Sequence, residues 1–291
     1  MAIVVVIHDS AAELAVLLAS IERCLGSRPH VVVVDNDSAD HGVRIAREWG
    51  AEVVGLQRNV GYGAANNSGL ERVTAPVCAL LNPDIELLDD GLTRLAAQAQ
   101  AREVLLVPRL LNDDGSPQRG AHPLPGRPWA LLPALLPATL LPRRLRLDAE
   151  PWRSPALREV GWAIAAAIVS RTSTLRRLGP FDPQTFMFYE DLELCLRARA
   201  AGIATLLDPR VELHHGGGHS TLRAYGGEPH ELLARRRRAV IGAYLGPSAL
   251  AWDDAAQALT FVTRAGARVI LRRDFRRERE QLKALRDARA D

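Results

Sequence analysis

Short apolar runs alternate with segments of helical periodicity along the first third of the chain. The apolar runs are residues 3–7, 31–34, 52–56 and 77–81. Between the first two runs, apolar residues recur at the spacing of one helix face, as Leu14, Leu17 and Ile21 show. Continuous apolar runs that alternate with helices are typical of parallel strands buried on both faces. We therefore expect an α/β fold with a mostly parallel sheet and helices on both faces.

Acidic and amide side chains follow three of the expected strands. Asp9 comes after the first strand, Asp35 after the second, and Asn82 and Asp84 after the strand at 77–81. In open α/β sheets, ligands bind outside the carboxyl ends of the strands. Asp35 leaves its strand and does not cap the next helix, so its carboxylate is expected to accept a hydrogen bond from the imide N–H of uracil or thymine, with Asp9 helping. The alternative is that these residues serve only in turns and caps.

The segment Asn82-Pro83-Asp84 also suits a metal ion. Residues two apart in an extended segment lie on the same side, so the amide and the carboxylate point together. Oxygen ligands of this kind suit Mg²⁺ or Mn²⁺, which would bridge to the oxygens of a diphosphate. The alternative is a routine Asn-Pro turn.

A glycine-bearing turn opens the helix expected at 61–73. Its polar and glycine residues are Arg58, Asn59, Gly61, Gly63 and Asn66. They do not form a dinucleotide fingerprint, because the third glycine is missing and the turn follows the third strand. Arg58 beside a helix N-terminus is a candidate diphosphate contact, since both groups attract anions. The alternative is a tight packing turn.

Glu190 and Asp191 follow an aromatic strip at 186–189 and begin a helix. A carboxylate at a helix start is stabilised as an anion by free backbone N–H groups. Burial beside apolar aromatic rings can instead raise the pKa of a carboxylate towards a useful range for proton transfer. Either setting suits a general base. The alternative is that one of the two residues only caps the helix.

Three histidines separated by glycines lie within residues 214–220. Glycines let the backbone approach a ligand closely, and a neutral imidazole can complete the shell of a divalent metal. Either His214 or His215 is the candidate ligand. Zinc is disfavoured because no thiolate or second carboxylate pair accompanies these histidines. The alternative is a polar loop.

Composition narrows the class of protein. Of the 291 residues, 47% are apolar and 24% are charged, and the net charge is only +3, which is typical of a soluble globular protein. Three scattered cysteines favour a reduced, cytoplasmic setting. No segment reaches membrane-spanning length without a charge or a proline.

Two segments fit an enzyme that visits the anionic inner face of a cell membrane. Residues 123–142 are rich in Pro and Leu, and residues 264–289 are rich in Arg. The alternatives are a loop or flap folded over the core and a solvated basic helix. The expected organisation is a domain at 1–227, with a nucleotide-binding half at about 1–110 and an acceptor-binding, catalytic half at about 111–227, then a basic helical extension at 228–291.

Taken in order, these motifs resemble those of inverting nucleotide-sugar glycosyltransferases of family 2, and most closely the rhamnosyltransferase-like branch, over about residues 1–225. The matching motifs are Asp35-Asn36-x-Ser38, Asn59-x-Gly61-x-x-x-x-Asn66, Asn82-Pro83-Asp84, Phe186-x-x-Tyr189-Glu190-Asp191 and His215-x-x-Gly218-x-Ser220. The resemblance implies the GT-A (Rossmann-like) fold and dependence on Mg²⁺ or Mn²⁺. It also implies a dTDP- or UDP-sugar donor, with rhamnose favoured, and a saccharide or lipid-linked saccharide acceptor in envelope polysaccharide assembly.

The resemblance further implies roles for single residues. These are base contact for Asp35, metal binding for Asp84 and His215, general base for Asp191, orientation of the acceptor or of Asp191 for Glu190, and contact with the acceptor for Trp162. The chain departs from the family pattern at Ile7-His8-Asp9, where Thr-Tyr-Asn is usual. It departs again at Asn82, which replaces the first acid of the metal motif and leaves fewer negative ligands.

Two other classes of protein are set against this interpretation. A nucleotidyltransferase that makes nucleotide sugars would carry a glycine-rich loop with Arg and Lys after the first strand, whereas His8-Asp9-Ser10-Ala11 follows it here. A non-catalytic nucleotide- or nucleic-acid-binding protein would use the arginine run at 235–238. Aromatic residues make up only 5% of the chain and are not interleaved with the basic residues, so no nucleic-acid partner is expected.

Overall fold

The computed structural model describes residues 1–136, 138–179, 181–182, 188–216 and 227–290. Contacts between residues divide the chain into two compact units. The first unit comprises Met1–His122 and Trp152–Gly217, and the second unit comprises Pro123–Pro151 and Gly218–Asp291.

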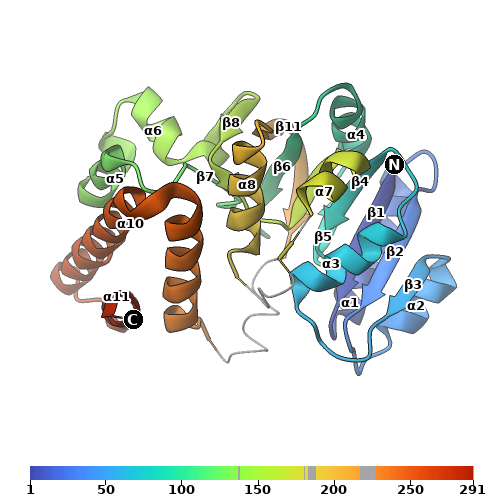
Figure 1. Cartoon of the computed structure of the whole chain (residues 1–291), viewed down its shortest axis with the longest axis horizontal. Helices are drawn as coiled ribbons and strands as arrows, with labels where there is room; N and C mark the ends of the chain where they lie inside the picture. Colours follow the sequence, from blue (N-terminus) through green and yellow to red (C-terminus); the bar gives the residue numbers. More distant parts are fainter. Residues whose placement is uncertain (137, 180, 183–187, 217–226, 291) are drawn as a thin grey trace. The chain divides into compact units, whose positions relative to one another are not determined.

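The first unit contains the strands and six helices among the described residues (Figure 1). Its strands are β1 (Ala2–Ile7), β2 (His30–Asp35), β3 (Glu52–Gly55), β4 (Val77–Leu81), β5 (Ile85–Leu87), β6 (Leu105–Leu111), β7 (Ala121–His122), β8 (Arg158–Val160), β9 (Trp162–Ala163), β10 (Ala167–Arg171) and β11 (Thr205–His215). Its helices are α1 (Ala11–Cys24), α2 (Gly42–Trp49), α3 (Tyr62–Glu71), α4 (Gly91–Ala101), α7 (Thr172–Leu178) and α8 (Glu190–Ala200).

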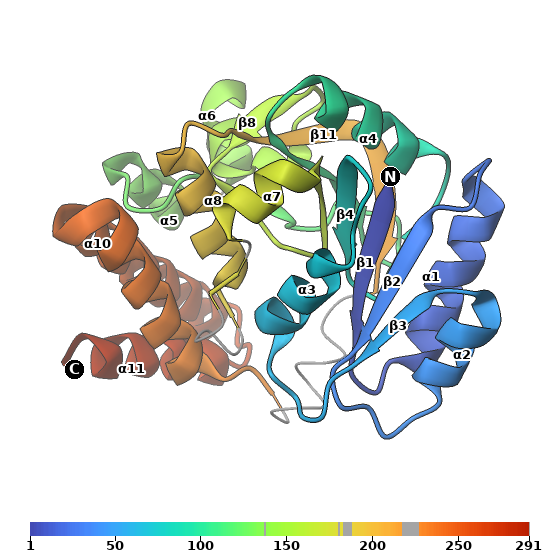
Figure 2. The ribbon, with the colours of Figure 1, turned by 45° about the vertical axis from the view of Figure 1, so that its right-hand side comes forward.

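A nine-stranded sheet forms the centre of the first unit. Its order is β3-β2-β1-β4-β10-β6-β11-β5, with β8 paired to β11 (Figure 2). Pairing is antiparallel at β10, β5 and β8 and parallel elsewhere. Six of these nine described strands therefore run in one direction, which confirms the prediction of a mostly parallel sheet. Their carboxyl ends meet at one edge of the sheet, where the reversed strands β10 and β5 begin.

Helices cover both faces of this sheet. Ile3, Val5 and Ile7 of β1 pack in one core with α1, α2 and α4. On the opposite face, Val4 lies against α3, and α7 packs on β10. Figure 1 shows α3 and α7 on the near face. All six residues of β1 are buried, which explains why this strand reads as a continuous apolar run.

Glycine allows α3 to approach the sheet closely. A Cβ atom added at Gly69 would lie 2.5 Å from Cγ1 of Val4 and 2.8 Å from Cγ2 of Val34. A Cβ atom at Gly63 would lie 2.7 Å from Cβ of Phe181. Gly63 and Gly69 therefore allow close packing of α3, which agrees with the interpretation of this glycine-bearing segment as a tight packing turn.

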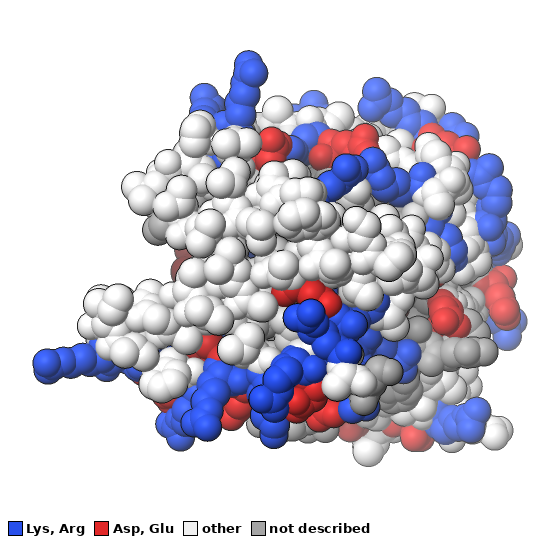
Figure 3. Space-filling view, turned by 60° about the vertical axis from the view of Figure 1, so that its left-hand side comes forward, with Lys and Arg blue, Asp and Glu red and all other residues white. Residues whose placement is uncertain are grey.

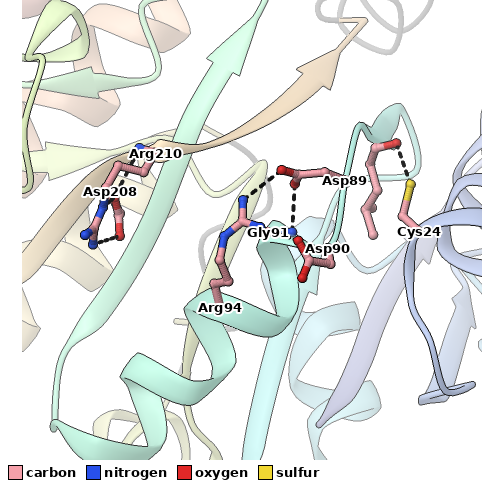
Figure 4. Close-up of polar contacts among 8 residues, drawn as sticks. Cys24, Asp89, Asp90, Gly91, Arg94, Asp208 and Arg210 are labelled. Carbon is pink, nitrogen blue, oxygen red and sulfur yellow. Dashed lines mark hydrogen bonds and ion pairs between the residues drawn. The ribbon is translucent and has the colours of Figure 1, made fainter.

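An ion pair holds the bend in β11, which has a bulge between Asp208 and Glu212. The buried Asp208 carboxylate accepts hydrogen bonds of 2.8 Å from Nε of Arg210 and Nε2 of Gln98. Figure 4 shows Arg210 folded back on Asp208. The hydrogen bonds from Arg210 outweigh the effect of burial and, with that from Gln98, lower the pKa of Asp208 to about 2.

The second unit is helical in the part that the structure describes. Its helices are η1 (Pro128–Ala130), α5 (Leu131–Leu135), η2 (Ala138–Leu140), α6 (Arg143–Ala149), α10 (His230–Ile270) and α11 (Arg276–Ala290), and the turn η3 (Pro151–Arg153) lies where the chain re-enters the first unit. A kink interrupts α10 at Gly246, which has φ 82° and precedes Pro247. α11 packs along α10, and α5 packs against α10, where the Thr263 hydroxyl donates to the carbonyl of Ala134 at 2.7 Å.

Part of the arginine run has a structural role in this unit. Arg237 pairs with Asp253 at 2.7 Å, and Arg238 pairs with Asp254. Both carboxylates are buried. Two of the four arginines at 235–238 therefore hold together the two parts of α10 that the kink separates.

The two units divide the chain differently from the expected organisation. Residues 123–151, which we placed in the acceptor-binding half, group with the C-terminal helices because α5 packs on α10. The expected boundary near residue 227 adjoins residues 217–226, which lie outside the described part of the chain. Among the described helices, none combines the length and the apolar character needed to cross a membrane.

Candidate active site

Hydrogen bonds tie together the loops at the carboxyl ends of β1 and β2. The Asp9 carboxylate accepts from the N–H of Ala39 at 2.7 Å, and the N–H of Asp9 donates to the Ser38 hydroxyl at 3.2 Å. Asp35 accepts from the N–H of Ser38 at 3.0 Å. The structure therefore brings the two expected base contacts onto adjoining loops, with Asp35 half-buried and Asp9 acting as a tie between the loops.

Two asparagines shape the turn before α3. The buried Asn36 donates from Nδ2 to Oδ1 of Asn59 at 2.9 Å and accepts from the N–H of Val60 at 2.9 Å. Asn59 also accepts from the N–H of Gly61 at 3.0 Å, and Gly61 adopts φ 87°. Arg58 precedes this turn and is exposed. Arg58 therefore stands shortly before the start of α3, and its contact with a diphosphate stays a prediction.

Asn66 lies differently from our expectation. Its side chain is fully buried, and its Nδ2 donates to the carbonyl of Tyr62 at 3.0 Å, one helical turn earlier. Its Oδ1 is buried without a hydrogen-bond partner in the described part of the chain. Contact with a donor would therefore require Asn66 to act from inside the helix packing and not from an open surface.

Asp84 and His215 meet at the carboxyl edge of the sheet. β11 pairs with β5 so that His215 lies opposite Ile85, next to Asp84. The Nε2 atom of His215 is 3.4 Å from Oδ1 of Asp84 and 3.5 Å from Nδ2 of Asn82. His214 points elsewhere and pairs with the exposed Asp113 at 3.1 Å. Of the two candidate histidines, His215 is therefore the one beside the acidic motif.

Gln118 orients the His215 ring. Its Oε1 lies 2.7 Å from Nδ1 of His215, and its Nε2 donates to the carbonyl of His215 at 3.5 Å. A side-chain carbonyl accepts and cannot donate, so Nδ1 carries a proton, and in the neutral ring Nε2 keeps its lone pair. This tautomer directs the lone pair of Nε2 toward Asp84 and Asn82.

These side chains fit a divalent metal with few protein ligands. Oδ1 of Asn82 is buried without a hydrogen-bond partner among the described residues, beside one carboxylate and one available imidazole lone pair. Within the described residues, no three His, Cys, Asp or Glu side chains gather into a metal cluster. Mg²⁺ and similar ions are commonly held by one or two carboxylates and completed by substrate phosphates and water. The donor set of Asp84, Asn82 and His215 therefore suits an ion that arrives with a diphosphate.

Glu190 and Asp191 begin α8 after a strained backbone. Phe188 and Tyr189 both have positive φ, 72° and 62°, although neither is glycine. Such conformations cost about 1–3 kcal/mol each and persist only where the surrounding structure imposes them. The Tyr189 carbonyl accepts from the N–H of Glu193 at 3.0 Å and so begins the helix. The two strained residues therefore lead directly into the Glu190-Asp191 pair at the N-terminus of α8.

Tyr62 links the acidic pair to Asp84. Its hydroxyl donates to the carbonyl of Ala165 at 2.8 Å. Burial raises the pKa of Tyr62 well above its ordinary value, and the negative charges of Glu190, Asp191 and Asp84 raise it further. Coulomb effects weaken with distance, so each of the three carboxylates lies near enough to Tyr62 to affect its pKa. The structure therefore brings together side chains more than 100 residues apart in the chain.

Trp162 is buried between aromatic neighbours and does not face open space. It is 8% exposed, stacks on His122 with a centroid distance of 4.2 Å, and lies 6.2 Å from the ring of Tyr189. Its contact with an acceptor, which we expected, would therefore pass through Tyr189. The motif residues Phe186, Gly218 and Ser220 lie outside the described residues.

Two residues of the site were not singled out in the sequence. Tyr62 stands between Gly61 and Gly63, a position that indicates a turn and gives no sign of the acidic surroundings. Gln118 follows β6 in an irregular segment, where nothing in the local pattern indicates a histidine partner 97 positions later. Only the pairing of distant strands reveals their roles.

Comparisons with known proteins agree with this fold. Residues 2–151 match the family model described as glycosyl transferase family 2. The chain is 27% identical over 243 residues to the N-acetylglucosaminyl-diphospho-decaprenol L-rhamnosyltransferase of Mycobacterium tuberculosis, which covers 76% of this chain and 77% of that protein.

Two solved structures show the same fold. S. aureus TarS 1–349 in complex with UDP-GlcNAc has a TM-score of 0.58 and 14% identity, over 99% of this chain and 80% of that chain. The mannosyltransferase PcManGT from Pyrobaculum calidifontis, in complex with GDP-Man and Mn²⁺, has a TM-score of 0.58 and 16% identity, over 99% of this chain and 85% of that chain. The predicted GT-A fold is therefore confirmed. The family model matches just over half of the residues of this chain, so the chain belongs to glycosyl transferase family 2.

Proposed function

We propose that this glycosyltransferase moves a sugar, with rhamnose favoured, from a dTDP- or UDP-sugar to a saccharide or lipid-linked saccharide, with inversion at the anomeric carbon. The observation that carries the proposal is the meeting of Asp84 and His215 at the carboxyl edge of the sheet, with Nε2 of His215 3.4 Å from Oδ1 of Asp84. The similarity to a rhamnosyltransferase whose name specifies a diphospho-decaprenol-linked sugar supports the choice of donor sugar and acceptor.

The donor would lie along the carboxyl edge of the sheet. Asp35, which accepts from the N–H of Ser38, would also accept from the imide N–H of the base. Arg58 and the N-terminus of α3 would attract the diphosphate, because a guanidinium and the backbone N–H groups at a helix start both favour anions. Asn36 and Asn59 would hold this turn in shape through their mutual hydrogen bond of 2.9 Å.

Asp84, His215 and Asn82 would hold Mg²⁺ or Mn²⁺. When bound, such an ion neutralises charge that develops on the leaving diphosphate. In the neutral ring, the contact of 2.7 Å with Gln118 places the proton on Nδ1 of His215 and leaves Nε2 to bind the ion. Asp84 is 17% exposed at its side chain, so it remains accessible to a ligand at this edge.

Asp191 would take the proton from the acceptor hydroxyl as that oxygen attacks the anomeric carbon. In an inverting transfer the base and the leaving group lie on opposite sides of the reacting carbon. The acidic pair and Asp84 come from different elements, α8 and the β4–β5 connection. Positioned proton transfer of this kind contributes about 10²–10⁴-fold to the rate. Glu190 would orient the acceptor or Asp191.

A donor panel tests the proposal. The purified chain is incubated with Mn²⁺ or Mg²⁺, a GlcNAc-diphosphate linked to a short polyprenyl chain, and dTDP-rhamnose, UDP-GlcNAc, UDP-glucose or GDP-mannose. We expect transfer from dTDP-rhamnose, detected by mass spectrometry, and a product whose anomeric configuration by NMR is opposite to that of the donor. Retention of configuration, or transfer only from GDP-mannose, would contradict the proposed chemistry.

A further inference from the structure

Charge is segregated between the two units. The first unit contains 18 Lys and Arg against 23 Asp and Glu, whereas the second contains 19 against 11. The net charge of +3 for the whole chain therefore hides an acidic unit that holds the candidate site and a strongly basic second unit. A basic unit of this size needs an anionic partner or solvent to offset its self-repulsion.

The cations of α11 line a cavity of about 850 Å³ in the second unit, between α11 and Ala258 of α10. The lining cations are Arg276, Arg279, Lys283, Arg286 and Arg289. The first four are spaced three or four residues apart, so they lie along one face of the helix. A single carboxylate, that of Glu280, lines the same cavity. Within the described part of the chain, no ion pair neutralises Arg279 or Lys283.

Exposed apolar side chains gather in the same unit. Twelve of the fifteen large apolar or aromatic side chains that are exposed among the described residues belong to it, although it has only 103 of the 291 residues. The most exposed are Ile270 at 82%, Leu140 at 70%, Leu271 at 61% and Leu135 at 57%. A soluble surface rarely concentrates apolar side chains in this way unless they meet a partner or a membrane.

Apolar and basic side chains are interleaved at two places in this unit. The turn between α10 and α11 reads Val269-Ile-Leu-Arg-Arg-Asp-Phe-Arg-Arg277. The segment of α5, η2 and α6 places exposed leucines before Arg143 and Arg144. Figure 3, in which the side of Figure 1 carrying α5, α10 and α11 comes forward, shows blue side chains bordering a broad area without charged residues.

We propose that the second unit is a docking surface for an anionic lipid bilayer. The apolar side chains of the α10–α11 turn and of α5–η2 enter the headgroup region, and the α11 cations bind lipid phosphates. Interleaved aliphatic and basic residues are the composition that binds an anionic membrane interface. A second copy of the chain is a poorer partner, because it would oppose the same cations across a two-fold axis. The proposal goes beyond the transfer reaction and does not depend on which sugar is moved.

Vesicle flotation tests the charge part of the proposal. The full chain is mixed with phosphatidylcholine vesicles, or with vesicles containing about 30% phosphatidylglycerol to supply the anionic surface potential. The charge variant replaces Arg276, Arg279, Lys283 and Arg286 with Gln. The matched control replaces four exposed first-unit arginines with Gln, at Arg44, Arg47, Arg72 and Arg102. We expect wild type and control to float only with the anionic vesicles. The charge variant should bind about 600-fold more weakly, because each of its four replaced cations contributes a factor of about five near the surface.

A second pair of variants tests the apolar part. The triple variant Leu135→Ser, Leu140→Ser and Ile270→Ser should bind anionic vesicles at least about tenfold more weakly, since each buried CH₂ contributes to membrane binding. Val16→Ser with Leu88→Ser, which alters exposed apolar residues of the first unit, should bind as wild type does. Circular dichroism checks that every variant is folded.

Three results would overturn the proposal. The first is equal flotation of the wild type with neutral and anionic vesicles, or no flotation with either. The second is wild-type binding by the charge variant. The third is a dimer, seen by light scattering, that the triple Ser variant dissolves, because the apolar surface would then belong to a contact between copies.

Discussion

Gln118 offers a sharp test of the metal site, because it acts on His215 without providing a ligand. The change Gln118→Leu keeps the size of the side chain and removes the carbonyl that accepts from Nδ1 of His215 at 2.7 Å. The imidazole proton is then free to move to Nε2, the nitrogen that faces Asp84 at 3.4 Å. Protonated Nε2 cannot bind a metal, and the ring also loses its fixed orientation.

The size of the effect follows from this contact. Loss of one outer-shell hydrogen bond to a metal-binding histidine typically lowers metal affinity by about 10–100-fold. This corresponds to about 1.4–2.7 kcal/mol, since each tenfold change is worth about 1.4 kcal/mol. A neutral hydrogen bond alone contributes about 0.5–1.5 kcal/mol, so we expect a value near the lower end, about tenfold.

Electron paramagnetic resonance of free Mn²⁺, titrated with protein at saturating UDP, measures this affinity directly. Gln118→Glu is the matched control. Its carboxylate also accepts a hydrogen bond from Nδ1 of His215, so this variant should bind Mn²⁺ at least as tightly as wild type. Thermal unfolding by circular dichroism monitors the fold of both variants. Equal Mn²⁺ affinity for Gln118→Leu and wild type would refute the role of Gln118. No Mn²⁺ binding by wild type would instead refute the metal site itself.

Two further predictions concern stability. The pKa of Asp208 falls from an ordinary 3.8 to about 2 on folding, so its charged form stabilises the fold by about 2 kcal/mol or less above pH 4, and this is lost as the pH falls from about 4 to 2. Asp208→Asn should therefore destabilise the protein to urea at pH 7 and hardly at all near pH 2, and a difference independent of pH would contradict this. Gly69→Ala should cost about 1–3 kcal/mol, because its Cβ would lie 2.5 Å from Val4. Gly266→Ala, a helical position with no atom within 4 Å, should be neutral or stabilising by up to about 1 kcal/mol, and equal melting shifts for the two variants would argue against the packing of α3.

Local pattern predicts the sheet and the place of the site well. The run at 3–7 is buried throughout, and the polar residues after β1, β2 and β4 do lie at one edge, because parallel strands share the direction of their carboxyl ends. These features depend only on the period of a strand and on the rule for parallel sheets. No long-range partner has to be known.

Features that depend on contacts between residues far apart in the chain are harder to predict from the sequence. Alternation along β11 sends His214 to Asp113 and His215 to Asp84, but the sequence alone does not show which face meets the sheet edge. Trp162 is covered by His122, and Asn66 turns into its own helix. The grouping of residues 123–151 with the C-terminal helices likewise follows from packing between segments that are far apart in the chain.

The most direct test of the account compares donor binding with turnover in Asp191→Asn. Asparagine keeps the shape of the side chain and cannot accept the proton of the acceptor hydroxyl. We expect the Kd for the donor, measured by calorimetry with Mn²⁺, to stay within about twofold of wild type, while kcat falls by about 10²–10⁴-fold. Near-normal kcat with unchanged donor affinity would contradict the assignment of Asp191 and with it the proposed arrangement of base and leaving group.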